Sequence, residues 1–459
     1  MRFGTDGVRG VANTELTPSY ALALGRTAAR VLGVRRAVVG GDTRRSTPMF
    51  EHALAAGLAS AGVDVTLVGV VPTPVVAFEA SRDDATLGAV VSASHNAFTD
   101  NGVKLFAPGG HKLSDDVQAR IEASLHDEGF GVAAPEAVGT IRVADDGGER
   151  LDDYRSHVLA ALDGRSLSGL TVALDAANGA GHRIAPEIFA AAGASVIAVH
   201  VDPDGANINA GCGATQPESL AAAVRAEGAD IGIALDGDGD RCIAVDAGGA
   251  VVDGDHILAI CATDLRDRGA LRADTVVVTV MTNLGFRLAM EHAGIRVVET
   301  AVGDRYVLEA LERESLSLGG EQSGHVIFRD RSTTGDGILT GLVLADIVAR
   351  SGRPLSELAA EAMTSLPQVL VNVATPPAGA ASADAPHRDW TAVLADDIAA
   401  VEAELGDHGR VLVRPSGTEP LVRVMVEAPT EQDAERAAAR LVAAIDDRSR
   451  LDEPAPTDQ

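Results

Sequence analysis

Lysine is almost absent from the sequence: among its 459 residues 38 are basic, and only Lys104 and Lys112 are lysine. A lysine ammonium is compact and can lose its proton, whereas an arginine guanidinium stays charged. A chain that uses arginine nearly everywhere, yet keeps two lysines close together, has either placed them on a loop by chance or retained them for chemistry.

Cysteine is also scarce. The three cysteines are odd in number, widely spaced and free of C-x-x-C pairs, which argues against a disulfide framework and a zinc site; they are Cys212, Cys242 and Cys261. The start of the chain has no apolar signal segment, and no stretch approaches the roughly 18 uncharged apolar residues of a membrane span. We therefore expect a soluble, cytoplasmic protein without a membrane partner.

Positive charge is outweighed by negative charge. With 38 basic and 66 acidic residues the net charge is −28, which repels nucleic acids and anionic lipids. No run of lysine or arginine offers a local exception, so we expect no nucleic-acid partner. Aromatic residues make up only 3%, but a hydrophobic content of 46% supports packed cores. The length allows about three or four domains.

Short apolar, β-branched runs alternate with Ala/Leu-rich helical patterns along most of the chain. This alternation is typical of α/β units with largely parallel sheets. Small or polar residues follow each run, and ligands of open α/β sheets bind beyond the carboxyl ends of the strands. The clearest expected strands are 38–42, 87–91, 172–175, 231–236 and 275–279, with a helix over 48–60.

The rhythm of strands and helices restarts after polar stretches, which divides the chain into four blocks: 1–152, 153–253, 254–366 and 367–459. The fourth has the pattern of a small α+β unit. Within it we expect strands over 369–373, 410–413 and 422–426, a loop over 375–382, a helix over 431–446 and a disordered tail from Asp447.

A serine lies among polar groups at the end of the expected strand 87–91. Ser94 is followed by His95, and Lys104 comes shortly afterwards. Phosphoryl transfer to or from a serine needs an activated hydroxyl and nearby cations, which these two residues could supply. The alternative is an ST-turn or a helix N-cap, in which the histidine is incidental.

Three aspartates alternate with glycines at the end of the expected strand 231–236: Asp236, Asp238 and Asp240. Glycine permits tight curvature, so the three carboxylates can converge on one Mg²⁺ or Ca²⁺ ion. An EF-hand does not fit, because Arg241 and Ala247 stand where that loop needs glycine and glutamate. A solvated acidic turn is the alternative, but carboxylates this close repel one another without a cation.

Two further loops have compositions that suit a sugar phosphate. Glu321, Ser323 and His325 lie in a glycine-framed loop, where Glu accepts from a diol and His moves a proton near neutral pH. The segment between two strands of the fourth block is dense in donors for a phosphate: Arg414, Ser416, Gly417, Thr418 and Arg423. It is no Walker A loop. Ordinary polar turns remain the alternative for both loops.

One reaction would use all of these clusters together. A mutase that moves a phosphoryl group through Ser94 needs a cation at the three aspartates, a clamp for sugar hydroxyls and a holder for a remote phosphate. The four clusters fall one to each block.

These motifs, in this order, resemble the α-D-phosphohexomutases over nearly the whole chain. The resemblance implies an α/β fold of four domains around a central cleft: three topologically similar α/β domains with mixed sheets and a C-terminal TBP-like α+β domain. Five further segments are similar to that family: Thr5–Gly10, Asn207–Asn209, Val252–Asp255, Val302–Val307 and Thr334–Leu339.

The resemblance also implies roles for single residues. It makes Ser94, rather than Ser92, the phosphoserine and a ligand of one Mg²⁺ together with Asp236, Asp238 and Asp240. A hexosamine or hexose 1,6-bisphosphate is the implied activator. The implied catalytic groups that help to move the hydroxyl proton are Arg9, Lys104 and His325, and the implied substrate-binding residues are Arg241, Glu321, Ser323, Arg414, Ser416, Gly417, Thr418 and Arg423.

Within the family, Gly320–His325 resembles the bacterial branch that interconverts glucosamine 6-phosphate and glucosamine 1-phosphate for UDP-N-acetylglucosamine and the cell wall. The alternatives are the phosphomannomutase/phosphoglucomutases, which more often carry Met where this chain has Gln322, and a non-catalytic cation- or sugar-binding protein. Ala97 stands where the family usually has proline, so we expect a slightly looser serine loop that changes rate more than chemistry. We expect a monomer or homodimer that binds a small sugar phosphate.

Overall fold

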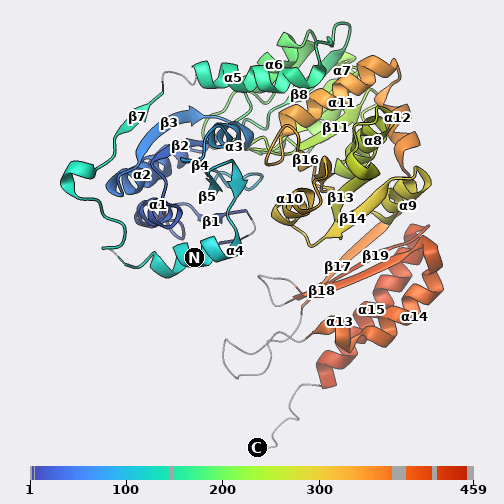
Figure 1. Ribbon diagram of the computed structural model, residues 1–459. Coiled ribbons are helices and arrows are strands. Elements are labelled where there is room, and N and C mark those ends of the chain that lie inside the picture. Colours follow the sequence, from blue (N-terminus) through green and yellow to red (C-terminus); the bar gives the residue numbers. More distant parts are fainter. Residues whose placement is uncertain are drawn as a thin grey trace, which may run out of the picture. The chain divides into compact units, whose positions relative to one another are not determined.

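The computed structural model describes residues 3–4, 6–127, 129–144, 148–374, 389–415 and 421–451. The chain divides into two compact units, residues 1–282 with 290–362 and residues 283–289 with 363–459. The first unit holds three α/β blocks, and the second is built on an antiparallel sheet (Figure 1).

A mixed sheet forms the core of the first block. Its strands run in the order β1-β5-β4-β2-β3-β7, with β6 paired to β5. β4 pairs in parallel with β2 and antiparallel with β5, and it is buried along its whole length. The elements are β1 (Val8–Val11), α1 (Pro18–Leu32), β2 (Arg36–Gly41), α2 (Thr47–Ser60), β3 (Asp64–Val70), α3 (Thr73–Ser81), β4 (Thr86–Val91), β5 (Asp100–Ala107), β6 (His111–Lys112), α4 (Asp115–Ser124) and β7 (Ile141–Val143).

The second block repeats the strand–helix alternation on a smaller sheet of order β12-β11-β10-β8-β9. β8, β9 and β10 are parallel, and β11 turns back antiparallel to β10, so the segment between them is a tight connection. Its elements are α5 (Gly148–Leu159), β8 (Thr171–Asp175), α6 (Ile184–Ala191), β9 (Ser195–Val199), α7 (Glu218–Glu227), β10 (Ile231–Leu235), β11 (Cys242–Asp246) and β12 (Val251–Val252).

The third block has a sheet of order β14-β13-β15-β16, in which only the pairing of β15 with β16 is antiparallel. This hairpin carries the glycine-framed loop. The elements are α8 (Gly254–Asp267), β13 (Thr275–Thr279), α9 (Leu284–His292), β14 (Arg296–Thr300), α10 (Asp304–Arg313), β15 (Leu318–Gly320), β16 (Val326–Phe328), α11 (Gly337–Ser351) and α12 (Leu355–Ala362).

The second unit is built on an antiparallel sheet of order β17-β19-β18. Helices cover one face of this sheet (Figure 1), and the apolar side chains of β18, β19 and α15 form its core. The elements are β17 (Gln368–Ala374), α13 (Trp390–Val393), α14 (Ala395–Leu405), β18 (Arg410–Pro415), β19 (Leu421–Glu427) and α15 (Glu431–Leu451).

The expected strands at 87–91, 172–175, 231–236 and 275–279 correspond to β4, β8, β10 and β13. The expected helix end was wrong, because α15 continues past Asp446 to Leu451. Arg448 explains the extension: its guanidinium pairs with Asp397 of α14 at 2.5 Å and also donates to the Ala444 carbonyl. The polar composition of this segment therefore reflects helix–helix pairing. The expected loop at 375–382 lies outside the described residues.

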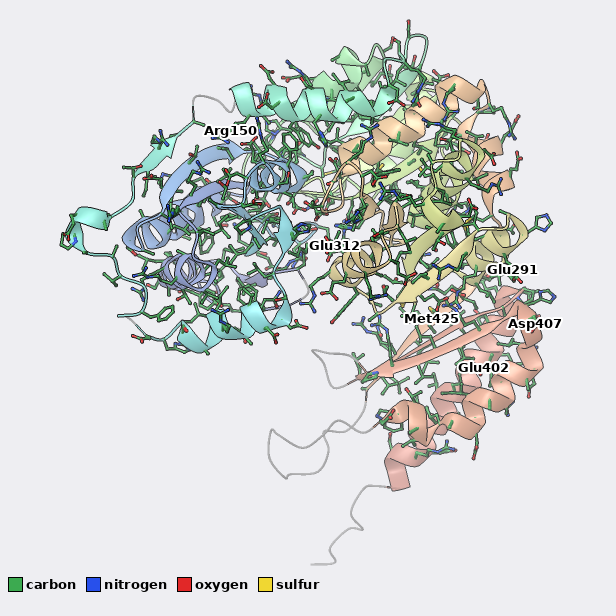
Figure 2. All side chains as sticks on the ribbon, viewed as in Figure 1. Arg150, Glu291, Glu312, Glu402, Asp407 and Met425 are labelled. Atoms are coloured by element: carbon green, nitrogen blue, oxygen red, sulfur yellow. The ribbon has the colours of Figure 1, made fainter. Side chains whose placement is uncertain are left out.

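Ion pairs join the first and third blocks along a line that we call the first-to-third seam, defined by Lys112–Asp304, His111–Glu312 and Arg305–Asp115. Arg305 contacts Asp115 with two nitrogens, at 2.5 and 2.9 Å, and His111 lies 2.7 Å from Glu312. Figure 2 labels Glu312 on α10 and Arg150 near the start of α5. Arg150 contacts Glu79 of α3 and so links α5 back to the first block.

None of the helices in the described part of the chain combines the length and the apolar character that crossing a bilayer requires.

Glu51 on α2 provides a test of the core of the first block. Its side chain is buried, and its Oε1 has no hydrogen-bond partner among the described residues. Burial and the negative charge of Asp42 raise the pKa of Glu51 from 4.5 to about 8. Between these pH values the folded protein holds a proton that the unfolded chain has released, so the free energy of unfolding falls as pH rises through this range.

We expect Glu51→Gln to remove this part of the pH dependence, because the amide stays neutral at every pH. Thermal unfolding measured from pH 5 to pH 9 should show a smaller decrease of Tm in the variant than in the original chain. Glu227→Gln, at an exposed position on α7, serves as the matched control and should retain the full decrease. Parallel Tm curves for Glu51→Gln and the original chain would contradict the prediction.

Candidate active site

The serine loop follows β4 and precedes β5. Ser94 is fully buried and has a left-handed backbone with φ of 52°. Its hydroxyl donates to Asp236 Oδ2 at 2.6 Å and lies 3.2 Å from His95 Nδ1. Ser92, by contrast, donates its hydroxyl to Asp42 at 2.6 Å and accepts from the Ser94 amide. Only Ser94 of the two serines therefore faces the aspartate loop, and no helix follows that it could cap.

The aspartate loop is the connection between β10 and β11. Asp236, Asp238 and Asp240 are all buried, and one carboxylate oxygen from each lies within 4.8 Å of the others. Gly237 lets this loop approach the serine loop, since a Cβ there would lie 2.5 Å from the Ser94 carbonyl oxygen. Close approach thus explains Gly237, whereas Gly239 has a left-handed backbone with φ of 72°, which glycine adopts without strain.

These carboxylates fit a divalent cation. Asp238 Oδ1 and Asp240 Oδ1 are buried and accept no hydrogen bond from any described residue. Burial and repulsion by Asp240 and Asp238 raise the pKa of Asp236, whereas for Asp238 the ammonium of Lys104 outweighs burial and lowers the pKa. Buried carboxylate oxygens without donors are the ligands that a hard cation such as Mg²⁺ prefers.

Lys104 supplies a positive charge at this point. Its Nζ lies 2.9 Å from Asp6, 2.7 Å from Asp238 and 2.8 Å from Asp240. Burial alone would lower the pKa of Lys104, but these three carboxylates raise it well above its ordinary value. These three contacts therefore favour the charged form of Lys104.

Three residues of the same cluster received no role from the sequence: Asp6, Lys112 and Asp304. The Lys112 ammonium lies 2.7 Å from Asp6 and also contacts Asp304, which lies 3.1 Å from His325 Nε2. Burial lowers the pKa of His325, but Asp304 and then Asp240 raise it to a net value above the ordinary one. For Lys112 the scarcity of lysine was the one indication in the sequence. It did not distinguish Lys112 from Lys104, so it gave neither residue a specific contact.

A cavity of about 410 Å³ opens beside these groups, within the range of roughly 300–1,000 Å³ typical of small-molecule sites. Residues of all three blocks line it, and they include two arginines and four carboxylates. Glu321 Oε1 accepts from the Gly303 amide at 3.1 Å, and burial raises the pKa of this carboxyl. The lining residues are Gly4, Asp6, Gly7, Arg9, Asp240, Arg241, Val302, Gly303, Asp304, Glu321 and His325.

The remaining expected residues of the first unit are Arg9, Arg241 and Ser323. Arg9 contacts Asp6, and Arg241 donates its amide to Asp236 at 3.1 Å, so both belong to the site. Burial, and then the positive charges of Arg241 and Arg9, lower the pKa of His95 to about 4, so that imidazole is neutral near pH 7. Ser323 is exposed and is not among the residues that line the cavity.

The second unit carries the expected phosphate-binding arginines. Arg414 on β18 lies directly opposite Arg423 on β19, so both project from the same face of the sheet. Burial and the charge of Arg423 lower the pKa of Arg414. Two arginines held against each other are favourable when an anion lies between them. Ser416, Gly417 and Thr418 lie outside the described residues.

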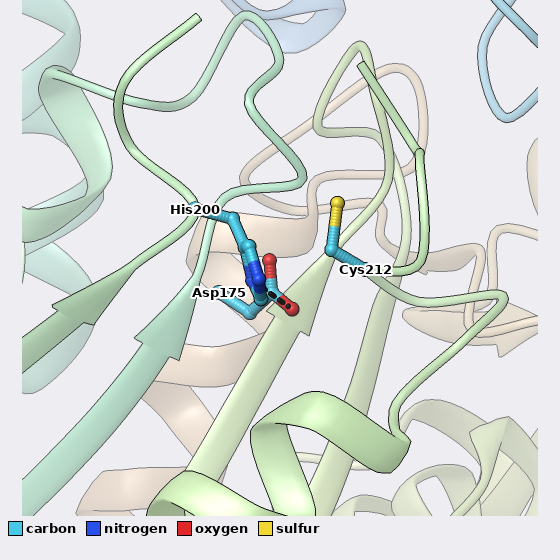
Figure 3. Close-up of side chains that lie close together, drawn as sticks. All are labelled: Asp175, His200 and Cys212. Atoms are coloured by element: carbon cyan, nitrogen blue, oxygen red, sulfur yellow. Dashed lines mark ion pairs between the residues drawn. The ribbon is translucent and has the colours of Figure 1, made fainter. Parts of the chain in front are cut away.

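Asp175, His200 and Cys212 form a second group with ligand-type atoms within 4.8 Å of one another (Figure 3). His200 Nδ1 lies 3.1 Å from Asp175, whose two oxygens already accept the amides of Ala177 and Gly213, at 2.8 and 2.9 Å. Burial and the charge of Asp175 raise the pKa of the Cys212 thiol to about 12, so it keeps its proton. These contacts describe a structural tie of the loops that follow β8 and β9.

Comparison with known proteins covers all four blocks. The family described as phosphoglucomutase/phosphomannomutase matches with its alpha/beta/alpha domains I, II and III over residues 1–131, 152–249 and 253–366. Its C-terminal domain matches residues 370–444.

Similar sequences are phosphoglucosamine mutases. The one from Streptomyces griseus is 55% identical over 449 residues, which cover 96% of this chain and 97% of the relative. The one from Frankia alni is 54% identical over 468 residues and covers 99% of both chains.

Similar structures include a phosphoglucomutase/phosphomannomutase family protein from Burkholderia thailandensis. It has a TM-score of 0.81 and 26% identity, and the match covers 99% of both chains. N-acetylphosphoglucosamine mutase from Aspergillus fumigatus, solved with GlcNAc-6P and magnesium, has a TM-score of 0.68 at 21% identity, covers 98% of this chain and 96% of its own, and supports the fold alone. With its four matched domains and near full-length relatives, the chain belongs to the phosphoglucomutase/phosphomannomutase family and groups with its phosphoglucosamine mutases.

Proposed function

We propose that this chain interconverts glucosamine 6-phosphate and glucosamine 1-phosphate through a phosphorylated Ser94 and a 1,6-bisphosphate intermediate. The observation that carries the proposal is the contact of Ser94 Oγ with Asp236 at 2.6 Å, beside buried oxygens of Asp238 and Asp240 that accept no hydrogen bond from described residues. A hydroxyl at a cation-binding loop is the arrangement that phosphoryl transfer requires.

Asp236, Asp238, Asp240 and Ser94 Oγ would hold one Mg²⁺. When bound, this cation neutralises charge on the phosphoryl oxygens and fixes their orientation. The chain's own Lys104 adds a positive charge next to two of these carboxylates, because Asp238, Asp240 and also Asp6 hold its proton in place. Charge neutralisation and positioning supply most of the rate in such reactions.

In the first step the bond between phosphorus and Ser94 Oγ breaks, and a bond from phosphorus to O1 of glucosamine 6-phosphate forms. The proton of the sugar hydroxyl must leave at the same time. His325 is the acceptor in our proposal: it lines the cavity, its Nδ1 has no hydrogen-bond partner among the described residues, and its Nε2 lies 3.1 Å from Asp304 and 3.2 Å from the Gly335 amide. That proton ends on Ser94 Oγ, so the products are the 1,6-bisphosphate and Ser94 with its hydroxyl restored.

In the second step the bisphosphate has turned end for end. Ser94 Oγ takes the phosphoryl group from O6, the proton returns to O6, and glucosamine 1-phosphate leaves. Both orientations present a second, non-reacting phosphate. Arg9 and Arg241 line the cavity, and in the proposal Arg414 and Arg423, with Ser416, Gly417 and Thr418, hold that remote phosphate.

Sugar recognition is assigned to the loop between β15 and β16. Glu321 lines the cavity, and its carboxylate can accept hydrogen bonds from sugar hydroxyls or from the 2-amino group. Ser323 completes this loop as a polar residue at its exposed tip. The near full-length likeness to phosphoglucosamine mutases supports the amino sugar as substrate.

A coupled assay that compares glucosamine, glucose and mannose 6-phosphates tests the substrate. We expect glucosamine 6-phosphate to give the highest kcat/KM, with glucose and mannose phosphates lower by about tenfold or more, since a buried group left unpaired discriminates strongly. Higher kcat/KM for glucose or mannose phosphate would instead identify a phosphoglucomutase or phosphomannomutase. Absence of turnover with all three would indicate a binding protein.

A further inference from the structure

Arg44 lies in the loop after β2 and is only 1% exposed, although its side chain is among the largest in the chain. Its Nε donates to Asp42 Oδ2 at 2.8 Å in an ion pair whose two side chains are both fully buried. Burial of a guanidinium is costly unless its donors are satisfied. The position of Arg44 therefore depends on what the rest of the guanidinium contacts.

The remaining donors of Arg44 bind main-chain carbonyls of the serine loop. Nη2 donates to the carbonyls of Ser94 and Asn96 at 2.9 and 2.8 Å. Nη1 donates to the carbonyl of Asp100 at 3.2 Å and also to that of Ala97. One buried side chain thus gathers four carbonyls on a seven-residue stretch that begins at Ser94.

A second side chain reaches the same carbonyls from the second block. Asn209 Nδ2 donates to Ser94 O at 2.9 Å and to Asn96 O at 3.1 Å. The main chain of Asn209 is fixed as well, because its N–H donates to the Ala177 carbonyl. Ala177 in turn donates its own N–H to Asp175. The carbonyls of Ser94 and Asn96 are therefore each held from two sides.

The loop needs such restraint. Ser94 has a positive φ of 52°, a conformation that persists in a residue with a side chain only where the surroundings impose it. Position 97 is alanine, so no proline ring limits the backbone there. The restraint must come from contacts to the loop.

We propose that Arg44 is a positioning residue for phosphoryl transfer: it fixes the serine loop so that Ser94 Oγ meets Asp236 and the transferred phosphate in line. The inference rests on the proposed role of Ser94. A guanidinium is required because its donors form a planar fork with fixed directions, whereas a lysine ammonium offers three donors at one point. Arg44 is not among the residues that line the cavity, and its donors contact Asp42 and the serine loop rather than Asp236, Asp238 or Asp240.

Arg44→Lys tests the proposal, because it keeps the charge opposite Asp42 and removes the fork. The serine of each variant is first phosphorylated with glucose 1,6-bisphosphate, and the phosphorylated fraction is measured by intact mass. We expect kcat per phosphorylated serine to fall by about tenfold to a hundredfold, with KM for glucosamine 6-phosphate changed less than about threefold. Arg45→Lys, at the exposed neighbouring position, should retain full activity.

A merely structural role predicts a different result. It would lower Tm and the yield of folded protein but leave kcat per phosphorylated serine unchanged, and that outcome would overturn the proposal. Asn209→Gly provides a second arm if Arg44→Lys does not fold, because glycine keeps the left-handed backbone of residue 209 while removing the amide. It should show the same loss of kcat at nearly constant KM.

The double variant Arg44→Lys/Ala97→Pro separates loop geometry from other effects. Proline restrains the loop by its ring, so it should restore part of the lost kcat in the Arg44→Lys background, provided that Ala97→Pro alone remains active. No recovery, with the single proline variant active, would count against the loop as the route of the effect. Failure of the proposed function is recognised separately, as full turnover by Ser94→Ala.

Discussion

Ser94→Ala is expected to lower turnover of glucosamine 6-phosphate by a factor on the order of 10³ or more, as loss of a covalent nucleophile does in other enzymes. The residual cavity still binds the substrate, but no hydroxyl remains at Asp236 to carry the phosphoryl group. The coupled assay with glucosamine 6-phosphate measures the loss.

Ser92→Ala is the matched control for this change. Ser92 is equally buried, but its hydroxyl contacts Asp42 rather than the aspartate loop. The protein purified with Ser92→Ala should still show a fraction one phosphate heavier by intact mass, with the phosphate on Ser94, whereas Ser94→Ala should show none. Turnover at the original rate by Ser94→Ala would end the phosphoserine mechanism.

The second large effect is expected from Asp238→Asn. Asp238 Oδ1 is buried without a hydrogen-bond donor among the described residues, and Oδ2 pairs with Lys104 at 2.7 Å. The substitution removes one negative charge and one ligand oxygen from the cation site. We expect the Mg²⁺ concentration for half-maximal activity to rise by about one to two powers of ten, since ligand charge tunes affinity over such ranges.

The same change should be visible without turnover. Mg²⁺ binding measured by calorimetry should weaken in Asp238→Asn, and Mg²⁺ should raise its Tm less than it raises that of the original chain. Asp267→Asn, at an exposed position on α8, controls for loss of charge alone. An unchanged Mg²⁺ titration in Asp238→Asn would remove these carboxylates from the cation site.

The sequence predicted those residues of the candidate site that belong to short motifs directly after a strand. Ser94 and the three aspartates each follow an apolar strand directly, and the strand ends β4 and β10 bring them together. Asp6, Asp304 and Arg44 were not predicted, because their significance arises only when distant segments meet. Asp304 lies in the segment Val302–Val307, which resembles the family but gave no role to this residue, and in the structure it contacts Lys112, 192 positions away.

Arg44 shows most clearly which residues a sequence cannot identify as part of a site. In the sequence it is one arginine among many beside Thr43 and Arg45, and nothing in its neighbours predicts burial. In the structure Arg44 is buried because four main-chain carbonyls of the serine loop accept hydrogen bonds from its guanidinium. Ser323 differs from its neighbours in the loop: composition grouped it with Glu321 and His325, but its side chain is exposed and it is not among the residues that line the cavity.

The first-to-third seam has a consequence for how the cavity can move. Lys112 and Asp304 are both more than nine-tenths buried, and Lys112 also holds Asp6. Opening along this line would separate Lys112 from Asp304, whereas Lys112 would keep its contact with Asp6 in the same block. The width of the cavity on this side is therefore set by the ion pairs of the first-to-third seam, which lie beside the residues that line the cavity.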